Sequence, residues 1–513
     1  MLPEVAKDEH TRVIVLYMES VSDGAKFVQA ASEVTKHKPV IALKVGRFEA
    51  GQKAAASHTG ALAGSEAAFD AAFAKAGILR ADTAEQMFDW ARALENCPLP
   101  HGKRMAILTN AGGPGVIAAD ALETNGLLLS QLTESTLKAL TTYLPPSASV
   151  HNPVDMLASA SPEAYATCLK ILLQDENVDG VMVILPPPPM FKTEDVAEKI
   201  IQTLESYTLE LDSSLALRVL SDKPEASFGT PESKPVVIAL MGSTLIEVAE
   251  QRFRNAKVQT YPFPERAASA LGALSRRAEY LENIKTLKVF KTFRVLEPKD
   301  NSVEELALAY GITTTPIKLA RDENEAVAIA NELGFPVVMK IASPDILHKS
   351  DVGGVLLNIK DTASLRSAYT QMVKRIKSAK PEARIEGVHL QRQIPEGQEV
   401  IIGAVRDPLF GALMMFGSGG IEVEGLKDVA FALAPLNQAE AREMIRKTWA
   451  GRKLKGFRSI PPVDEESVID VLIKLSFLAY EHPEIEEIEI NPLRVLQKGS
   501  VAVDVRIKFV VQP

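Results

Sequence analysis

Short apolar runs alternate with segments of helical spacing through the first half of the chain. The segment 24–36, for example, carries apolar residues at helical intervals between two runs rich in β-branched residues. The alternation restarts after a Pro- and Gly-containing linker at 97–102. Continuous apolar runs are typical of parallel strands buried on both faces, so the pattern predicts two doubly wound α/β units with parallel sheets. The expected strands are 12–18, 39–45, 104–110, 180–185 and 235–240.

The hydrophobic pattern changes from about residue 301. Strand-like segments now follow one another closely, with helical segments near both ends, which is typical of an α+β domain with antiparallel strands. We therefore expect domains at 1–97, 98–284 and 285–513. A polar segment at about 207–234 offers little periodic apolar surface and is expected to be a mobile insertion in the second domain. The strands expected in the third domain are 336–341, 354–358, 385–391, 399–405, 412–416, 485–490 and 501–510.

Length and composition agree with this organisation. A chain of 513 residues suits about three domains. The net charge of −9 argues against nucleic acid and anionic membranes as partners. Only Cys97 and Cys168 are present, which excludes a disulfide framework and a metal site built from cysteines. No apolar run is long enough to span a bilayer, and the acidic N-terminal residues do not fit a signal peptide, so we expect a cytoplasmic protein.

The first candidate for chemistry is His58. Its neighbours Ser57, Thr59 and Gly60 are small, so backbone amides could approach an anion here, and an imidazole held among them could accept a phosphoryl group. Glu19 follows the first expected strand, at the edge where open α/β sheets bind ligands, and its carboxylate could fix the tautomer of His58. The residues alone also fit a loop histidine and a solvated acid with no chemical role.

A glycine-rich turn opens the first helix of the second domain. Gly112, Gly113 and Gly115 come soon after an expected strand, and a strand, a glycine turn and a helix in this order favour anion binding. A tight turn with a purely structural role is the alternative. The Asn-Pro-Val-Asp segment at 152–155 is a weaker candidate for a companion loop.

The third domain carries a pattern typical of a nucleotide site. Lys340 lies on an apolar strand, where burial of its charge would require an anion such as phosphate. Glu399 begins another expected strand. Glu489 and Asn491 alternate with isoleucines and so share one face of a strand. Together with Asp504 they offer the oxygen ligands that Mg²⁺ prefers.

These motifs together resemble the ADP-forming acyl-CoA synthetases, the acetate–CoA ligase relatives of succinyl-CoA synthetase. The resemblance covers almost the whole chain. It implies two flavodoxin-like succinyl-CoA-ligase units followed by an α+β ATP-grasp domain, with the phosphohistidine loop in the first unit. The motifs that carry it, in the family's order, are SHTGALAGS, TNAGGPG, NPVD, VVMKIASPDILHKSDVGGV, FGSGGIEVEGLKDVAF and EIEINPL.

The resemblance also implies a reaction. Acyl-CoA, ADP and phosphate interconvert with a carboxylic acid, CoA and ATP. Phosphate attacks the thioester to give an acyl phosphate and release CoA. His58 then carries the phosphoryl group from the acyl phosphate to ADP with Mg²⁺. By the same resemblance Glu19 orients His58. His348, which on spacing alone fits a loop residue better than a catalyst, matches a second phosphoryl relay. The resemblance matches Lys340 and Glu399 to nucleotide contacts, and Asn491 and Asp504 to metal ligands.

Two features depart from the family. Relatives usually begin with a CoA-binding domain whose Gly-rich loop has no counterpart before Arg12. A separate CoA-binding subunit or a homo-oligomer is therefore expected to supply the CoA site, unless the chain is a fragment or has lost the complete reaction. Ala432 stands where many relatives have arginine, which puts one phosphate contact in doubt.

Two other functions remain open on the sequence. One is a catalytically incomplete regulatory or assembly module, related to the ligase-like region of protein lysine acetyltransferases. The other is an ATP-grasp ligase that joins a carboxylate to an amine, which would not require the loop around His58.

Overall fold

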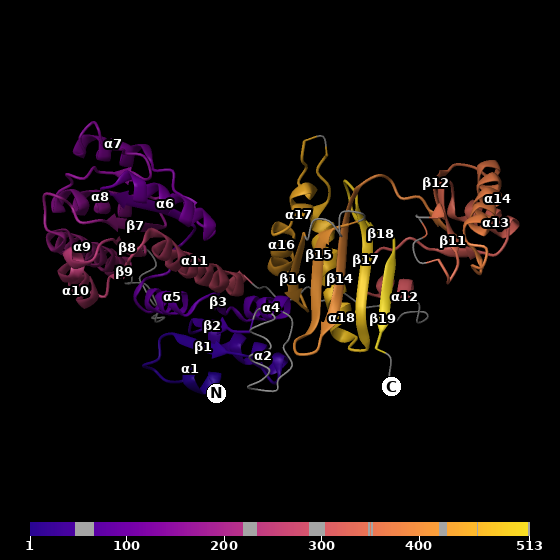
Figure 1. Ribbon diagram of the computed structural model, residues 1–513, viewed down its shortest axis with the longest axis horizontal. Helices are drawn as coiled ribbons and strands as arrows, with labels where there is room; N and C mark the ends of the chain where they lie inside the picture. The colour runs from indigo at the N-terminus through magenta and orange to yellow at the C-terminus, as the bar shows by residue number, and fades with distance from the viewer. Residues whose placement is uncertain are drawn as a thin grey trace. The chain divides into compact units, whose positions relative to one another are not determined.

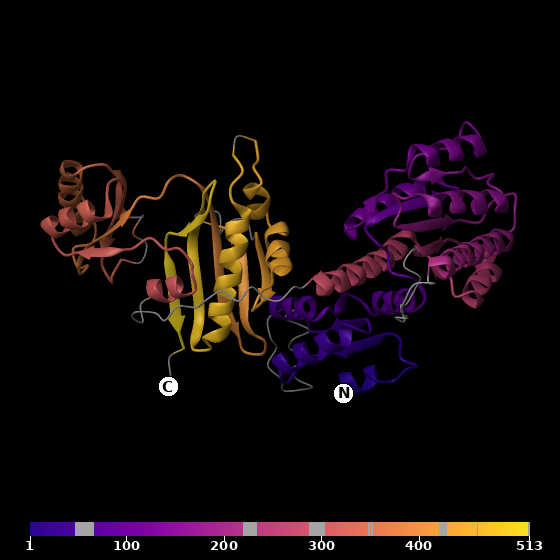
Figure 2. The same cartoon turned by 180° about the vertical axis from the view of Figure 1, so that it is seen from behind.

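The computed structural model describes residues 1–46, 66–218, 233–286, 303–346, 349, 352–419, 428–458 and 460–510. The chain divides after residue 288 into two compact units, and each is described by itself. In Figure 1 the first unit is coloured from indigo through magenta and the second from red-orange to yellow, and Figure 2 shows both from behind.

The first unit begins with a small parallel sheet of order β1-β2-β3. Strand β2 is buried along its whole length, as expected for a strand covered on both faces. Met18 pairs with Lys44, so β1 and β2 end level with each other. The elements of this part are α1 (Leu2–Ala6), β1 (Ile14–Met18), α2 (Gly24–Thr35), β2 (Val40–Lys44), α4 (Glu66–Ala76), β3 (Leu79–Ala81) and α5 (Ala84–Asn96).

A second parallel sheet follows, with the order β5-β4-β7-β8-β9 and with β6 beside β4. This is the flavodoxin-like order, in which the chain winds outward in both directions from β4, so the topological switch point lies between β4 and β7. Separate apolar cores cover its two faces. The strands are β4 (Arg104–Thr109), β5 (Leu128–Leu129), β6 (Val154–Asp155), β7 (Gly180–Leu185), β8 (Val236–Leu240) and β9 (Gln259–Tyr261). The helices are α6 (Gly112–Thr124), α7 (Glu134–Tyr143), α8 (Pro162–Gln174), α9 (Thr193–Arg218), the 3₁₀ helix η1 (Thr244–Ile246), α10 (Glu247–Asn255) and α11 (Pro264–Thr286).

Helix α11 packs against both parallel sheets. Its Leu274 belongs to a core of the second sheet, and the neighbouring Ala273 belongs to the core of the first. Trp90 of α5 adds a hydrogen bond from its indole N–H to Ser269 Oγ of α11, at 2.9 Å. Helix α11 therefore joins the two sheets, with neighbouring residues in the core of each.

Gly77, which follows α4, allows an aromatic ring of α11 to approach the backbone. Its φ of +68° lies in the left-handed region, and a Cβ built there would lie 2.1 Å from Tyr280 Cζ. The Tyr280 hydroxyl lies 2.9 Å from Thr35 Oγ1 and donates to the Ala76 carbonyl at 3.3 Å. Only glycine satisfies both the backbone and the space at this position.

Gly77→Ala is expected to lower the free energy of unfolding by about 3 kcal/mol, because backbone strain and overlap with the ring act together. Gly126→Ala is the matched control. Gly126 has a φ of +75° but no atom within 4 Å of a built Cβ, so only the backbone strain of about 1 kcal/mol applies. Urea denaturation of both variants measures the difference, and equal losses would show that the contact with Tyr280 contributes nothing.

The prediction of a mobile insertion at 207–234 is wrong in its first part. Helix α9 continues to Arg218, and Tyr207 packs against the apolar core of the second sheet. Near the other end, Lys234 donates to the Asp175 carbonyl at 2.6 Å. The apolar pattern missed this extension because leucine and glutamate favour a helix even without a long apolar stripe. Residues 219–232 lie outside the described residues.

The second unit contains two antiparallel sheets, as the pattern predicts. The smaller has the order β10-β13-β11-β12, and the larger the order β16-β15-β14-β17-β18, with β19 also paired to β17. Helices α16, α17 and α18 cover one face of the larger sheet and form the main core with it. The strands are β10 (Lys318–Ala320), β11 (Val337–Ala342), β12 (Val355–Ile359), β13 (Gly387–Arg392), β14 (Gln398–Asp407), β15 (Gly411–Ser418), β16 (Val429–Leu433), β17 (Ile485–Val495), β18 (Ser500–Ala502) and β19 (Val505–Phe509). The helices are α12 (Val303–Ala309), α13 (Glu323–Leu333), α14 (Thr362–Ala379), α16 (Gln438–Arg446), α17 (Trp449–Leu454) and α18 (Glu465–Glu481).

The predicted fold class is confirmed, as two parallel-sheet α/β units followed by an α+β domain. One expected strand, 501–510, is in fact two strands, and Asp504 lies in the break between them. None of the described helices combines the length and the hydropathy that crossing a bilayer would require.

Candidate functional site

The loop with the predicted phosphohistidine lies outside the described residues. This holds for His58 and its neighbours Ser57, Thr59 and Gly60, and also for His348 in the third domain. Their roles therefore stay predictions. The structure does describe the residues on both sides of the first loop, the last of β2 and the first of α4.

Glu19 lies directly after β1, at the carboxyl edge of the first sheet. Its Oε2 atom is buried and has no hydrogen-bond partner among the described residues. Lys44 ends the neighbouring strand level with Met18, and its charge acts on Glu19. Sequence reasoning missed Lys44, although a lysine that ends an apolar strand is the same signal that drew attention to Lys340.

The glycine turn lies at the switch point of the second sheet. Helix α6 begins at Gly112, and its N-cap residue Ala111 makes no side-chain capping hydrogen bond, so the cap does not occupy the amides of Gly112 and Gly113. A Cβ on Gly113 would meet nothing within 4 Å, whereas one on Gly115 would lie 3.3 Å from Thr109 Cγ2. Gly113 thus leaves the helix N-terminus open, and Gly115 allows close packing on β4.

Two polar side chains lie near this helix N-terminus. Asn110, between β4 and α6, is 4% exposed, and its Oδ1 has no hydrogen-bond partner among the described residues. Asp155 Oδ2 would lie 3.2 Å from a Cβ built on Gly112, so a carboxylate borders the turn. Backbone amides at a helix N-terminus can bind an anion, whereas the Asn110 oxygen and the Asp155 carboxylate are acceptors and would face a donor or a cation.

The companion loop at 152–155 has a structural task. Asn152 donates to the carbonyls of Met105 and Ser130, at 2.9 and 3.0 Å, and accepts from the Ile107 amide at 2.9 Å. These bonds use the side chain of Asn152 to tie the loop to β4. The loop adds a carboxylate, Asp155, to the edge of the turn and not a second helix N-terminus.

Lys340 lies on β11 in the smaller antiparallel sheet. Burial lowers the pKa of Lys340; the Asp504 carboxylate opposes this effect, and the cations Lys349, Arg506 and Arg494 add to it. The fold therefore brings this lysine within electrostatic reach of Asp504, one of the predicted metal ligands.

Glu399, on β14, faces Arg494 across the β14–β17 pairing and forms an ion pair with it. Sequence reasoning did not identify this arginine. The feature that could have identified it is a basic residue on the same expected strand as the predicted metal ligands. The Nε atom of Arg494 is buried and has no hydrogen-bond partner among the described residues.

The predicted metal ligands lie close together. Asn491 donates from Nδ2 to Glu489 Oε1 at 2.8 Å, so the two share one face of β17 as the alternation predicts. The Asn491 amide donates to the Asp504 carbonyl at 3.1 Å, and Asp504 also pairs with Arg506 at 3.2 Å. Two carboxylates and one amide oxygen fit Mg²⁺. No cluster of three or more His, Cys, Asp or Glu residues suited to a metal occurs among the described residues.

Ala432 lies on the helix-covered side of the larger sheet, where it packs against the main core. Glu489 lies between the core residues Ile488 and Ile490 and so points to the opposite face. The alanine therefore removes no side chain from the face that carries the predicted metal ligands.

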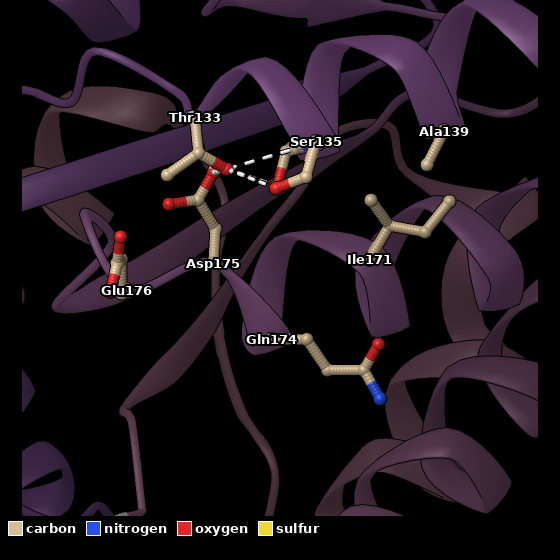
Figure 3. Close-up of a pocket in the computed structure, with 8 residues that line it drawn as sticks. Thr133, Ser135, Ala139, Ile171, Gln174, Asp175 and Glu176 are labelled. Atoms are coloured by element: carbon tan, nitrogen blue, oxygen red, sulfur yellow. Dashed lines mark hydrogen bonds between the residues drawn. The ribbon is translucent and has the colours of Figure 1, made fainter.

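A separate surface pocket lies between α7 and the end of α8, and Figure 3 shows the residues that line it. Burial works to raise the pKa of Asp175, but hydrogen bonds from Thr133, Thr136 and Asn177 outweigh it and lower the pKa. The carboxylate accepts from the Thr133 amide at 2.9 Å and from the Asn177 amide at 2.8 Å. Its polar atoms are thus used within the fold, and we assign this pocket a structural role.

Three family models match successive parts of the chain. They are the succinyl-CoA ligase like flavodoxin domain over residues 1–94, the Ligase-CoA domain over 105–217 and the ATP-grasp domain over 295–509. Acetate–CoA ligase [ADP-forming] I of Archaeoglobus fulgidus is 37% identical over 531 residues, which cover 98% of this chain and 71% of that protein. The chain belongs to the ADP-forming acetate–CoA ligase family. The resemblance drawn from the motifs is confirmed.

Two further relatives show how the family varies. The 4-hydroxybutyrate–CoA ligase [ADP-forming] of Nitrosopumilus maritimus is 34% identical and covers 99% of this chain and 72% of its own length. Subunit beta of acetate–CoA ligase [ADP-forming] I of Pyrococcus furiosus is 46% identical over 212 residues, 41% of this chain and 90% of that protein. By their names, members of the ADP-forming acetate–CoA ligase family differ in the acid that they activate, and some of them are separate subunits.

Proposed function

We propose that this chain is an ADP-forming acyl-CoA synthetase, which interconverts acyl-CoA, ADP and phosphate with a carboxylic acid, CoA and ATP through an acyl phosphate and a phosphohistidine. The observation that carries the proposal is the match over 98% of the chain to an ADP-forming acetate–CoA ligase. The electrostatic proximity of Lys340 to Asp504, which lies near Glu489 and Asn491, supports it, because a nucleotide with its metal ion needs both a cation and oxygen ligands.

The second unit binds the nucleotide in this proposal. Lys340 contacts the phosphates and Glu399, held by Arg494, contacts the nucleotide. Mg²⁺ would supply charge neutralisation for the phosphates when bound, and its ligands would be Glu489, Asn491 and Asp504.

The first unit binds phosphate and forms the phosphohistidine. The uncapped start of α6 receives the phosphate, since the partial positive charge of a helix N-terminus favours an anion. Glu19 holds His58 in the tautomer whose other nitrogen attacks phosphorus, and His348 serves as a second relay. The phosphate-binding residues are Ser57, Thr59, Gly60, Gly112, Gly113 and Gly115.

A separate CoA-binding subunit or a second copy of the chain is a partner in this proposal. The Pyrococcus relative, which is one named subunit of a larger enzyme, supports this arrangement. Adding a candidate CoA-binding subunit is then expected to raise acyl-CoA formation while nucleotide binding stays unchanged.

Exchange of label between ADP and ATP tests the proposal on the chain by itself. The phosphohistidine step needs only nucleotide, Mg²⁺ and the histidine, so the purified protein should exchange label without acid or CoA. Parallel reactions with GDP and GTP establish the base preference. Tight nucleotide binding without any exchange would contradict the proposal and favour a regulatory module.

A further inference from the structure

Lys44 ends β2 with its ammonium group almost fully enclosed. The residue is 3% exposed. Its Nζ donates to the Val45 carbonyl at 2.6 Å and lies 4.7 Å from the centre of the Phe69 ring. An enclosed ammonium is unfavourable unless carboxylates lie nearby, so the charges around Lys44 indicate what it does.

The nearest described carboxylate belongs to Glu66, the first residue of α4. Its Oε1 lies 3.9 Å from Lys44 Nζ. Glu66 also pairs with Arg80 of β3, and Arg80 pairs with Asp70 on the next turn of α4. Arg80 pairs with Oε2 of Glu66, whereas the buried Oε1 faces Lys44, so Lys44 and Arg80 share the charge of Glu66.

Glu19 is the third carboxylate of this cluster. It follows β1 at the level where Lys44 ends β2, and no other strand lies between them. Burial lowers the pKa of Lys44, and the charge of Arg80 lowers it further. The carboxylates of Glu66 and Glu19 act in the opposite direction and raise it. Two cations therefore face three carboxylates, and Glu19 is the one for which the structure shows no hydrogen bond or ion pair among the described residues.

We propose that Lys44 is a positioning residue for phosphoryl transfer, whose enclosed ammonium is a counter-charge of the Glu19 carboxylate as well as of Glu66. This inference rests on the proposed function, in which Glu19 orients His58. A phosphoryl group brought to that histidine is anionic and would be repelled by Glu19 alone. Lys44 offsets this repulsion and keeps Glu19 in place, without itself touching the phosphoryl group.

The test compares Lys44→Met with Arg80→Met. Both variants remove a cation beside Glu66, but only the first removes the charge that acts on Glu19, so Arg80→Met controls for a merely structural effect. The rate of phosphoenzyme formation at saturating Mg-ATP is measured from pH 6 to 10. We expect Lys44→Met to lower the rate about tenfold at neutral pH, and Arg80→Met to change it less than about twofold.

The pH dependence of the phosphorylation rate distinguishes a charge effect of Lys44 from a merely structural one, because a structural role would leave this dependence unchanged. In the wild type the rate should fall on the alkaline side, below the pH at which an exposed lysine titrates, as Lys44 loses its proton. This fall should be absent in Lys44→Met, displaced to higher pH in Lys44→Arg, which stays charged, and kept in Arg80→Met.

Several results would overturn the inference while leaving the proposed function intact. One is a wild-type rate of phosphoenzyme formation that does not fall at alkaline pH. Another is a Lys44→Met variant with the wild-type rate and pH profile. The third is an equal effect of Lys44→Met and Arg80→Met on the rate. If Lys44→Met does not fold, as judged by its thermal transition, the profile of Lys44→Arg decides. A wild type that forms no phosphoenzyme would instead refute the proposed function itself.

Discussion

Replacing His58 with alanine is expected to abolish phosphorylation of the chain by Mg-ATP. In the proposed reaction an imidazole nitrogen forms the N–P bond, and a methyl group offers no nucleophile in its place. We expect the rate of phosphoenzyme formation to fall by at least about 10⁴-fold. Incorporation of label from ATP measures it, with acid and base treatment afterwards, because phosphohistidine is labile in acid and stable in base.

The control for this variant is His101→Ala. His101 is an exposed histidine in the connection before β4, so its loss should leave phosphorylation unchanged. Equal labelling of the wild type and His58→Ala would contradict the role of His58. It would transfer the phosphoryl relay to His348 or to another residue.

Replacing Lys340 with methionine is expected to lower kcat/KM for ADP by about 10²–10³-fold in the exchange reaction. A charged donor directed at a phosphate in a partly enclosed site contributes an effect of this size. Methionine keeps the length of the side chain and removes only the charge. The matched control is Lys318→Met, because Lys318 lies on β10 of the same sheet and pairs with Glu332.

The pH dependence of ADP affinity gives an independent check on Lys340. Burial lowers its pKa, so the ammonium loses its proton at a lower pH than an exposed lysine does. ADP affinity should therefore fall as the pH rises through this range. In Lys340→Arg the guanidinium stays charged, and the alkaline fall should disappear. An unchanged profile in that variant would show that Lys340 does not meet the phosphates.

Much of the architecture could be predicted from the sequence because it depends on local patterns. Wholly buried strands such as β2 and β7 appear as continuous apolar runs, and they predict parallel sheets without any knowledge of contacts. Closely spaced strands after residue 301 likewise predict the antiparallel domain. The alternation of Glu489 and Asn491 with isoleucines predicts their common face for the same reason.

Relations between distant segments were not accessible in this way. The ion pair of Glu399 with Arg494 depends on the register of β14 and β17, and the grouping of Lys44 with Glu66 and Arg80 depends on the placement of α4. Neither periodicity nor composition records such register.

The sequence by itself determined the class of each domain, the motifs of the family and the types of residue available for phosphoryl transfer. Only the tertiary structure decided which charges neutralise one another, and that Asn152 ties its loop to β4 instead of binding an anion. The physical reason is that hydrogen bonds and ion pairs are short-ranged and directional, so they are set by the packing of distant segments.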